Sequence, residues 1–203
     1  METTVKRVDG YDDCRFSRKV LLQHGAFVVN ETLAYEVEIL SATQAQIRGD
    51  ARYFMEVIEA FRFYAQHITR FLDVQGRVVA DFSPVPTFTV NLADIQPSQF
   101  LVDIDKQQAV SQFVTGWEDV VIPLSPFGER FVSQDGHTRL SVAVQRDFKQ
   151  VKGYLADGDE YLYAFAQAAK ERGVVTPYDL KAVPHRQYIV EWYGFCDAFF
   201  ARK

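Results

Sequence analysis

The residues best suited to chemistry lie together in the stretch Asp135-Gly136-His137-Thr138-Arg139. A short apolar run, residues 130–133, precedes this stretch, and apolar residues at helical spacing follow it from Leu140. The amides and the dipole of a helix N-terminus favour an anion, and Arg139 adds a permanently charged, forked donor. The pattern therefore predicts a phosphate site. The simpler alternative is an Asp-Gly turn that begins a helix, since this dipeptide is common in turns.

The composition of the chain is that of a globular protein with an acidic balance. Of its 203 residues, 48% are hydrophobic and 24% are charged, so the chain can bury a core. The formal net charge is -5, and no run of Lys or Arg stands out. Proteins that hold DNA by its phosphates carry a basic surface, so direct DNA binding by this chain is not expected.

The cysteines and the apolar runs favour a cytoplasmic location. Cys14 and Cys196 lie far apart and form no CxxC or zinc spacing, and the histidines form no HxH or HExxH pair. The polar start of the chain lacks the apolar core of a signal peptide. No apolar run approaches the ~20 residues that span a bilayer, so no membrane partner is expected.

The pattern of residues 1–86 indicates a small α+β region, to which the sequence assigns no function. Residues 1–18 are expected to form a loosely held arm. Apolar alternation predicts strands, and apolar residues at helical spacing predict one long helix. The connector Ser83-Pro84-Val85-Pro86 is the candidate domain boundary. The predicted strands are 26–29, 34–39, 45–48, 68–72 and 77–82, and the predicted helix is 51–66.

The second part, residues 87–203, predicts a further α+β domain with a helical extension from about residue 160. Residues 95–99 are expected to form a loop and residues 125–128 a turn. The aromatic stripe of residues 188–200 is expected either to join the core or to form a homodimer interface. The predicted strands are 87–92, 120–124, 129–133 and 151–155. The predicted helices are 104–114, one from the central motif to about 147, 160–172, a short one at Thr176-Pro177, and 185–201.

The order of features in residues 87–156 recurs in one known superfamily. A strand leads to a loop with Pro97, a short helix leads to a hairpin, and the hairpin ends in Asp135-Gly136-His137-Thr138-Arg139. This order resembles the ParB/sulfiredoxin superfamily, and in particular the branch that contains free serine kinases and uncharacterised bacterial ParB-like proteins. The resemblance implies an α+β, ParB/sulfiredoxin-like nucleotide-binding domain.

The resemblance also implies a ligand and the residues that hold it. Gly136, His137, Thr138 and Arg139 would hold the phosphates of ATP or ADP, with CTP as an alternative. Asp135 would bind a water of an associated Mg²⁺ or orient His137. Amides and Arg suit phosphate oxygens, and phosphoryl transfer needs mostly positioning and charge neutralisation. The loop residues Ser98 and Gln99 would line the same nucleotide site.

The catalytic base is the point at which this chain departs from the serine kinases. Those enzymes carry a glutamate in the loop where this chain has Ser98-Gln99, and a glutamine cannot take a proton from an alcohol at neutral pH. Asp103, Asp105 or Asp159 would have to replace it. Two functions therefore stay open. One is a phosphotransferase acting on a small hydroxyl substrate such as free serine. The other is a non-catalytic nucleotide-sensing or partition-related module that acts through a partner.

Overall fold

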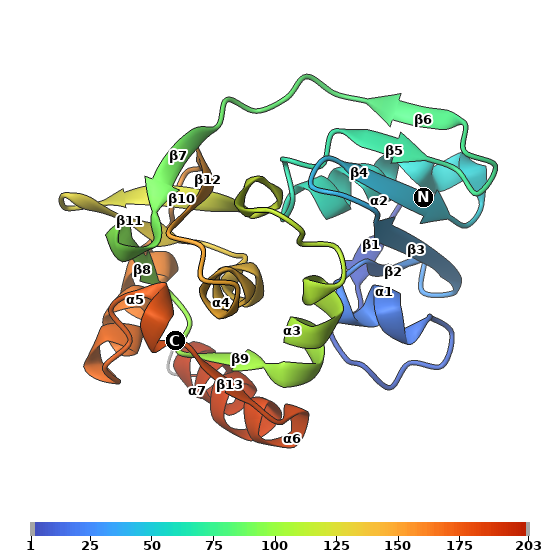
Figure 1. Cartoon of the computed structure of the whole chain (residues 1–203). Helices are drawn as coiled ribbons and strands as arrows, with labels where there is room; N and C mark the ends of the chain where they lie inside the picture. Colours follow the sequence, from blue (N-terminus) through green and yellow to red (C-terminus); the bar gives the residue numbers. More distant parts are fainter. Residues whose placement is uncertain (1–2, 202–203) are drawn as a thin grey trace. The chain divides into compact units, whose positions relative to one another are not determined.

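The computed structural model describes residues 3–201 and has a mixed α+β architecture. The chain divides into two compact units, Met1–Val85 and Pro86–Lys203, called unit 1 and unit 2 below. The division falls inside the proline connector 83–86. Figure 1 traces the helices and strands of both units along the chain. Each unit has its own buried apolar cluster.

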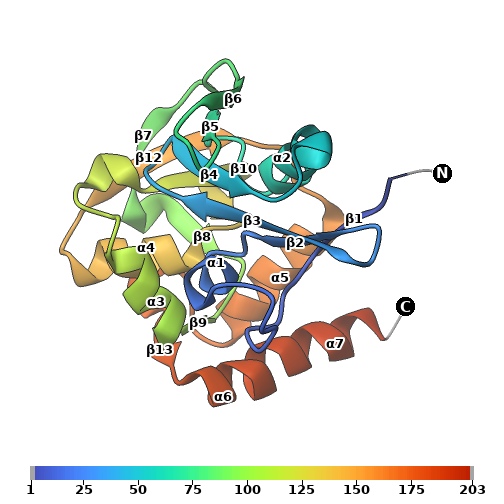
Figure 2. The ribbon, with the colours of Figure 1, turned by 90° about the vertical axis from the view of Figure 1, so that its right-hand side faces the viewer.

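Unit 1 contains a six-stranded sheet whose strands follow chain order, β1-β2-β3-β4-β5-β6 (Figure 2). All neighbours are antiparallel except β4 and β5, which are parallel. A helix, α2, connects these two strands, as parallel neighbours require. The strands are β1 (Val5–Arg7), β2 (Ala26–Val29), β3 (Leu33–Ile39), β4 (Gln44–Arg48), β5 (Arg70–Leu72) and β6 (Val78–Asp81).

Helix α2 (Phe54–Arg62) supplies the helical half of the unit 1 core. A short 3-10 turn, Ala51–Tyr53, precedes it and is capped by Asp50, whose carboxylate accepts a hydrogen bond from Arg52 N at 3.0 Å. The helix ends at Arg62, earlier than the predicted residue 66; residues 63–64 form a turn, and Phe63 is 78% exposed there. The buried residues of the helix and sheet that pack together include Phe27, Tyr35, Ile47, Val57, Ile58, Phe61 and Phe71.

The first residues of unit 1 correct the prediction of a loose arm. Strand β1 pairs with β2, with Val5 opposite Val29. A short helix, α1 (Arg18–Leu22), follows and is capped by Ser17, whose hydroxyl accepts from Val20 N. A strand of three residues is too short to show an alternating pattern, and this explains why the sequence did not indicate it.

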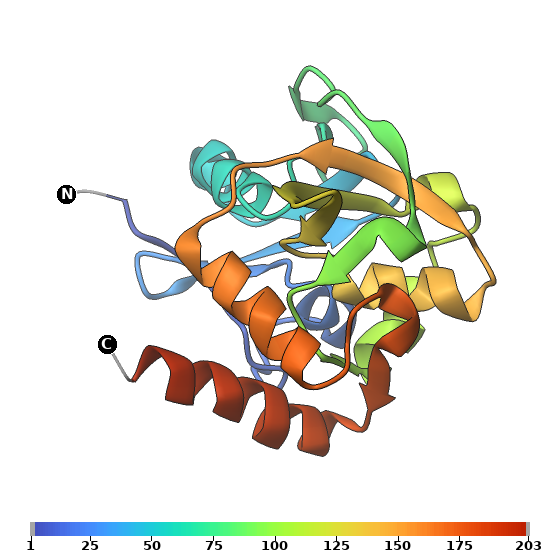
Figure 3. The same cartoon turned by 90° about the vertical axis from the view of Figure 1, so that its left-hand side faces the viewer.

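Unit 2 contains a five-stranded mixed sheet in the order β7-β12-β10-β11-β8 (Figure 3). Two pairs are parallel, β12 with β10 and β11 with β8. Strand β10 continues through Phe127, so the predicted turn at 125–128 lies instead at residues 128–129. The strands are β7 (Phe88–Asn91), β8 (Ile95–Pro97), β10 (Val121–Phe127), β11 (Arg130–Ser133) and β12 (Gln150–Leu155).

A second, two-stranded parallel sheet in unit 2 was not predicted. Strand β9 (Leu101–Asp103) pairs with β13 (Lys181–Val183), which comes from the C-terminal extension. Residues 95–97, expected to be part of a loop, form strand β8 beside β11. Each of these strands has three residues and is stabilised by a partner distant in sequence, so local patterning carries little information about it.

The helices of unit 2 largely follow the predicted ranges. They are α3 (Ile104–Ser111), α4 (His137–Gln145) and α5 (Glu160–Glu171), followed by a 3-10 turn, Pro177–Asp179, capped by Thr176. The last helical stretch is α6 (His185–Tyr188), a π-helical turn (Ile189–Tyr193) and α7 (Gly194–Phe200). In residues 3–201 no helix is both long and apolar enough to cross a membrane.

Candidate phosphate site

The backbone of the Asp135–Arg139 stretch is arranged at the ends of two parallel strands. Strands β8 and β11 are neighbours, with Pro97 opposite Ser133 at their carboxyl ends. The chain leaves β11 through residues 134–136 and enters α4 at His137. The loop that leaves β8 therefore lies beside the N-terminus of α4. Ligands commonly bind at such strand ends, where helix amides point outward.

Gly136 is required at its position for two physical reasons. Its φ is +80°, in the left-handed region that favours glycine, and it is the residue from which α4 begins. A Cβ at this position would lie 2.7 Å from Ile122 Cδ1 and 3.1 Å from Arg139 Nη2. The guanidinium of Arg139 is therefore packed against the glycine backbone at the start of the helix.

Arg139 is held in place by strand β10 and by Asp135. Its Nη1 donates a hydrogen bond to the Val121 carbonyl at 2.6 Å, and its Nη2 lies 3.7 Å from Asp135 Oδ2. The Arg139 side chain is 14% exposed, whereas that of Asp135 is 58% exposed. The site thus offers a positioned cation beneath an accessible carboxylate. Thr138, in the first turn of α4, is half-buried.

His137 differs from its expected role as a phosphate ligand, because its side chain is buried inside unit 2. Its Nε2 accepts a hydrogen bond from Ser98 N–H at 3.2 Å and lies 3.1 Å from the Ser133 hydroxyl. Because Nε2 accepts from an amide, the ring is neutral with its proton on Nδ1. His137 therefore joins the loop after β8 to the loop after β11.

The buried position of His137 changes its acid–base behaviour. The pKa of this imidazole is lowered to about 4, chiefly by burial; the Asp135 carboxylate opposes the shift and the Arg139 cation adds to it. The imidazole stays neutral at physiological pH. It is thus poorly suited to bind a phosphate as a cation, and its role is to connect the two loops.

Ser98 and Gln99, which the resemblance implies would line the nucleotide site, have side chains that bond within the protein. The Ser98 hydroxyl donates to the Ser133 carbonyl at 2.7 Å. The Gln99 amide donates to the Leu101 carbonyl and to the Tyr188 hydroxyl, the latter at 3.2 Å. Both residues shape the loop that borders the site.

The candidate base Asp103 is fully buried and occupies a structural position. Its carboxylate caps α3 by accepting from Asp105 N at 2.9 Å, and it lies 2.6 Å from His185 Nδ1. Asp105, in the first turn of α3, is half-buried. Asp159, the third candidate, caps α5 by accepting from Leu162 N at 2.8 Å. Of these carboxylates, Asp103 is the least accessible to a substrate.

Helix α3 nevertheless brings Asp105 to the same end of unit 2 as the motif. One turn into α3, Gln107 donates to the Ser141 hydroxyl, one turn into α4, at 2.6 Å. At the other end, Arg146 donates to the Ser111 carbonyl at 2.8 Å. Because the starts of α3 and α4 contact each other and their ends do too, the two helices run in the same general direction. Their N-termini therefore lie on one side.

A metal site made only of protein ligands is not present among residues 3–201, where no three His, Cys, Asp or Glu side chains come together. Asp135 is a single accessible carboxylate. Mg²⁺ usually keeps several waters and is bound by one or two carboxylates together with substrate phosphates. The residues present fit Mg²⁺ only in company with a phosphate ligand.

The sequence did not indicate the buried cluster behind the site. Lys106 is 4% exposed, and its Nζ lies 5.5 Å from the centre of the Tyr188 ring. Burial raises the pKa of the Tyr188 hydroxyl, so it stays protonated. His185 comes from the residue after Pro184, at the start of α6. These side chains meet only because β13 pairs with β9, and no short spacing in the sequence signals that pairing.

Comparison with known proteins adds one structural similarity. No family model matches the chain, and no curated protein is detectably similar to it. The crystal structure of protein Atu1540 from Agrobacterium tumefaciens is similar over 54% of this chain and 69% of that chain, with 12% sequence identity and a TM-score of 0.35. A TM-score this low carries no argument about fold or function.

Proposed function

We propose that unit 2 binds a nucleotide through its phosphates at the N-terminus of α4, and that it acts as a nucleotide-sensing module. The observation that carries the proposal is the left-handed Gly136 with the Arg139 guanidinium packed beside it, at the first turn of a helix. This arrangement offers backbone donors, a helix dipole and a fixed cation to one anion.

Asp135 gives the proposed site a preference for a metal-associated phosphate. Its carboxylate is exposed beside Arg139, and bare phosphate oxygens would be repelled by it. A Mg²⁺ ion between the carboxylate and the phosphates would remove that repulsion. The proposal therefore favours Mg²⁺ complexes of ATP, ADP or CTP over inorganic phosphate.

The choice of a nucleotide rests on the resemblance of residues 87–156 to ParB/sulfiredoxin-like domains. The α+β architecture of unit 2 and the position of the motif between β11 and α4 are compatible with that resemblance. The sensing role is favoured over catalysis by the position of Asp103, which is fully buried and engaged with His185. A base has to reach the proton that it removes.

Phosphotransfer to a small alcohol such as serine is a second candidate, favoured by one observation. The N-termini of α3 and α4 lie on the same side of unit 2, and Asp105 is in the first turn of α3. In such a reaction, the substrate oxygen bonds to the terminal phosphorus, the bond to the leaving nucleoside diphosphate breaks, and a carboxylate accepts the hydroxyl proton.

Thermal unfolding with nucleotides tests the proposal. MgATP, MgADP and MgCTP are titrated against the protein, and a bound nucleotide raises Tm by mass action. Arg139→Ala should abolish the ligand-dependent shift. Arg52→Ala is the matched control, because Arg52 also pairs with an aspartate near it in sequence, Asp50, but lies in unit 1. The absence of a shift with all three nucleotides would refute the phosphate site.

The same samples separate sensing from catalysis. Protein with MgATP and serine is followed by phosphorus NMR for a new phosphomonoester. A Tm shift without product supports the sensing module. Product that disappears in Asp105→Asn, with nucleotide binding retained, supports the phosphotransferase instead.

A further inference from the structure

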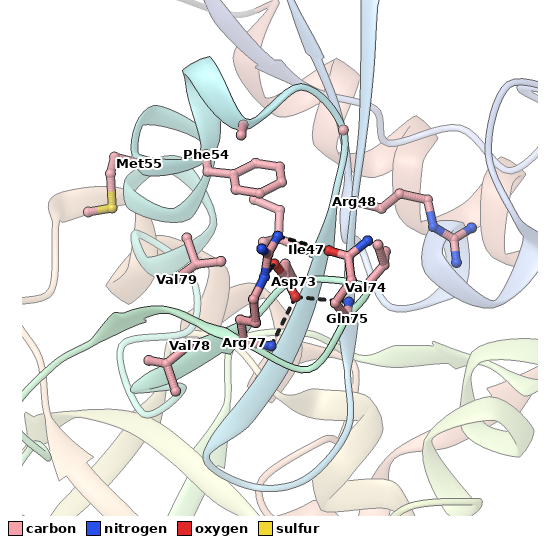
Figure 4. A pocket seen from close by; sticks show the side chains of 12 residues that line it. Ile47, Arg48, Phe54, Met55, Asp73, Val74, Gln75, Arg77, Val78 and Val79 are labelled. Carbon is pink, nitrogen blue, oxygen red and sulfur yellow. Dashed lines mark hydrogen bonds and ion pairs between the residues drawn. The ribbon is translucent and has the colours of Figure 1, made fainter.

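Unit 1, to which the sequence assigns no function, contains a cavity of about 560 Å³ (Figure 4). This volume lies in the usual range for small-molecule sites, which are mostly apolar with a few placed polar groups. The cavity is bordered by the end of β4, the start of α2 and the hairpin between β5 and β6. Its lining residues are Ile47, Arg48, Gly49, Ala51, Phe54, Met55, Asp73, Val74, Gln75, Arg77, Val78 and Val79.

Three apolar side chains of the cavity wall are partly exposed to solvent. Met55 is 43% exposed, and Val74 and Val78 are each 48% exposed. Isolated exposed apolar residues need no explanation, but these three border one hollow together with Phe54 and Val79. Figure 4 shows the Phe54 ring and Val79 directed towards the same space.

Asp73, the only acidic residue of the lining, is bonded within the hairpin turn and does not face a ligand. It is 6% exposed and accepts hydrogen bonds from Gln75 N at 2.8 Å, Arg77 N at 2.9 Å and Arg77 Nε at 2.7 Å. Burial raises the pKa of this carboxyl, but the hydrogen bonds together outweigh burial, so the pKa is lowered and the carboxylate stays ionised inside the turn. The carboxylate thus fixes the hairpin and orients the arginine.

The two arginines of the lining are placed differently. The Arg77 guanidinium projects over the hollow towards Phe54, and its side chain is 76% exposed although Nε is bonded to Asp73 (Figure 4). Arg48 points its guanidinium away from the hollow, and its Nη1 lies 3.2 Å from Glu36 Oε2. Of the two arginines, Arg77 is therefore the one placed to pair with an anion beside the apolar wall.

We propose that this cavity binds a small organic anion with an apolar ring system, whose carboxylate or sulfonate pairs with Arg77. The ring lies against Phe54, Met55 and Val78, which removes apolar surface from water. The Arg77 guanidinium is fixed through Nε, which donates to Asp73, and through Nη2, which donates to Gln75 Oε1 at 3.1 Å. Nη1 and the second N–H of Nη2 can therefore meet the anion with little further loss of side-chain freedom. The site is formed by residues of unit 1 alone, whereas the proposed phosphate site is formed by residues of unit 2.

The proposal is tested on the full chain with three probes. Anilinonaphthalene sulfonate reports apolar binding by fluorescence, and naphthoate and its uncharged amide are measured as competitors. Arg77→Gln should weaken naphthoate by about tenfold, the loss expected for a charge-assisted hydrogen bond, and should change the amide little. Val78→Asp should weaken all three probes by about tenfold, because it places a charge against the ring.

Two controls are matched to these variants. Arg48→Gln removes the cavity arginine that faces Glu36, so naphthoate affinity should be retained. Val190→Asp changes a valine that is 69% exposed in unit 2, so all probes should still bind. Urea unfolding confirms that each variant is folded. Probe binding lost in Val190→Asp but kept in Val78→Asp would overturn the proposal. Equal binding of naphthoate and its amide would overturn the role of Arg77.

Discussion

The carboxylate of Asp103 lies 2.6 Å from Nδ1 of His185 and joins two segments that are 82 residues apart in sequence. The same carboxylate caps α3, and Asp103 is fully buried, whereas the His185 side chain is 28% exposed. One side chain therefore stabilises a helix start and the contact between β9 and the C-terminal extension. A charge in this position is costly to leave without its partner.

Asp103→Ala should lower the free energy of unfolding by about 3 kcal/mol, because it removes a helix cap and one member of a buried pair. Urea denaturation measures the change. Asp159→Ala is the control, since Asp159 caps α5 through Leu162 N but is exposed, and it should cost about 1 kcal/mol. Equal losses in the two variants would contradict the role of the buried pair.

The stability of unit 2 should fall as the pH is lowered from 6.5 to 4.5. The pKa of His137 is about 4 in the folded protein and about 6.5 when unfolded, so in this window the unfolded chain binds the proton first. The loss should be about 2 kcal/mol, since each pKa unit corresponds to about 1.4 kcal/mol. Above pH 6.5 His137 is neutral in both the folded and the unfolded chain, so the stability of unit 2 no longer depends on its protonation.

His137→Gln isolates this effect, because its carbonyl oxygen accepts the Ser98 amide without titrating. Urea denaturation at pH 6.5 and 4.5 should show a smaller pH dependence for the variant than for the native protein. The carboxylates with lowered pKa values, such as Asp73, titrate below this window. An unchanged pH dependence in the variant would show that the imidazole is accessible to protons.

Gly136→Ala should destabilise the protein more than Gly128→Ala. Both glycines have positive φ, +80° and +62°, which costs a non-glycine residue about 1 kcal/mol. Only Gly136 is crowded, by Ile122 and Arg139, so overpacking should add about 2 kcal/mol there. Thermal or urea unfolding of the two variants measures the difference. Similar losses would mean that the residues around Gly136 relax without cost.

Residues 1–85 and 86–203 should each fold when produced separately. The unit 1 cluster around Phe61 and Ile47 and the unit 2 cluster around Ile122 and Leu140 are each composed of residues from one unit. Circular dichroism should show a cooperative thermal transition for both fragments. Residues 1–66, which lack β5 and β6, serve as a control that should not fold. A disordered fragment 1–85 or 86–203 would contradict the division.

Helices and strands long enough to show a repeating apolar pattern could be predicted from the sequence. Strand β3 alternates over seven residues, and α2 places Val57, Ile58 and Phe61 on one buried face. Strands β1, β8, β9 and β13 have three residues each, and their existence depends on partners distant in the chain. Tertiary pairing decides such short segments, so local propensity could not find them.

The residue types and the local order of the candidate site could be taken from the sequence, but the burial of its members could not. Residue types indicate that Gly136 and Arg139 suit a phosphate, and the structure places them together. The same reasoning assigned phosphate contact to His137 and catalysis to Asp103, and both are buried in hydrogen-bonded positions. The residue type of an imidazole or a carboxylate is the same whether the side chain is exposed in a binding site or buried in the core. Only the packing of β8, β9 and β13 around it decides which role is available.

The parallel pairing of β9 with β13 has a consequence for folding kinetics. Because Val102 pairs with Ala182, the second sheet cannot form until most of unit 2 has been synthesised. Contacts of such long sequence separation slow folding, because the loop must close before any contact is gained. Until then the polar side chains destined for the interior stay hydrated. The N-terminus of α3 thus acquires its final surroundings late in the folding of the chain.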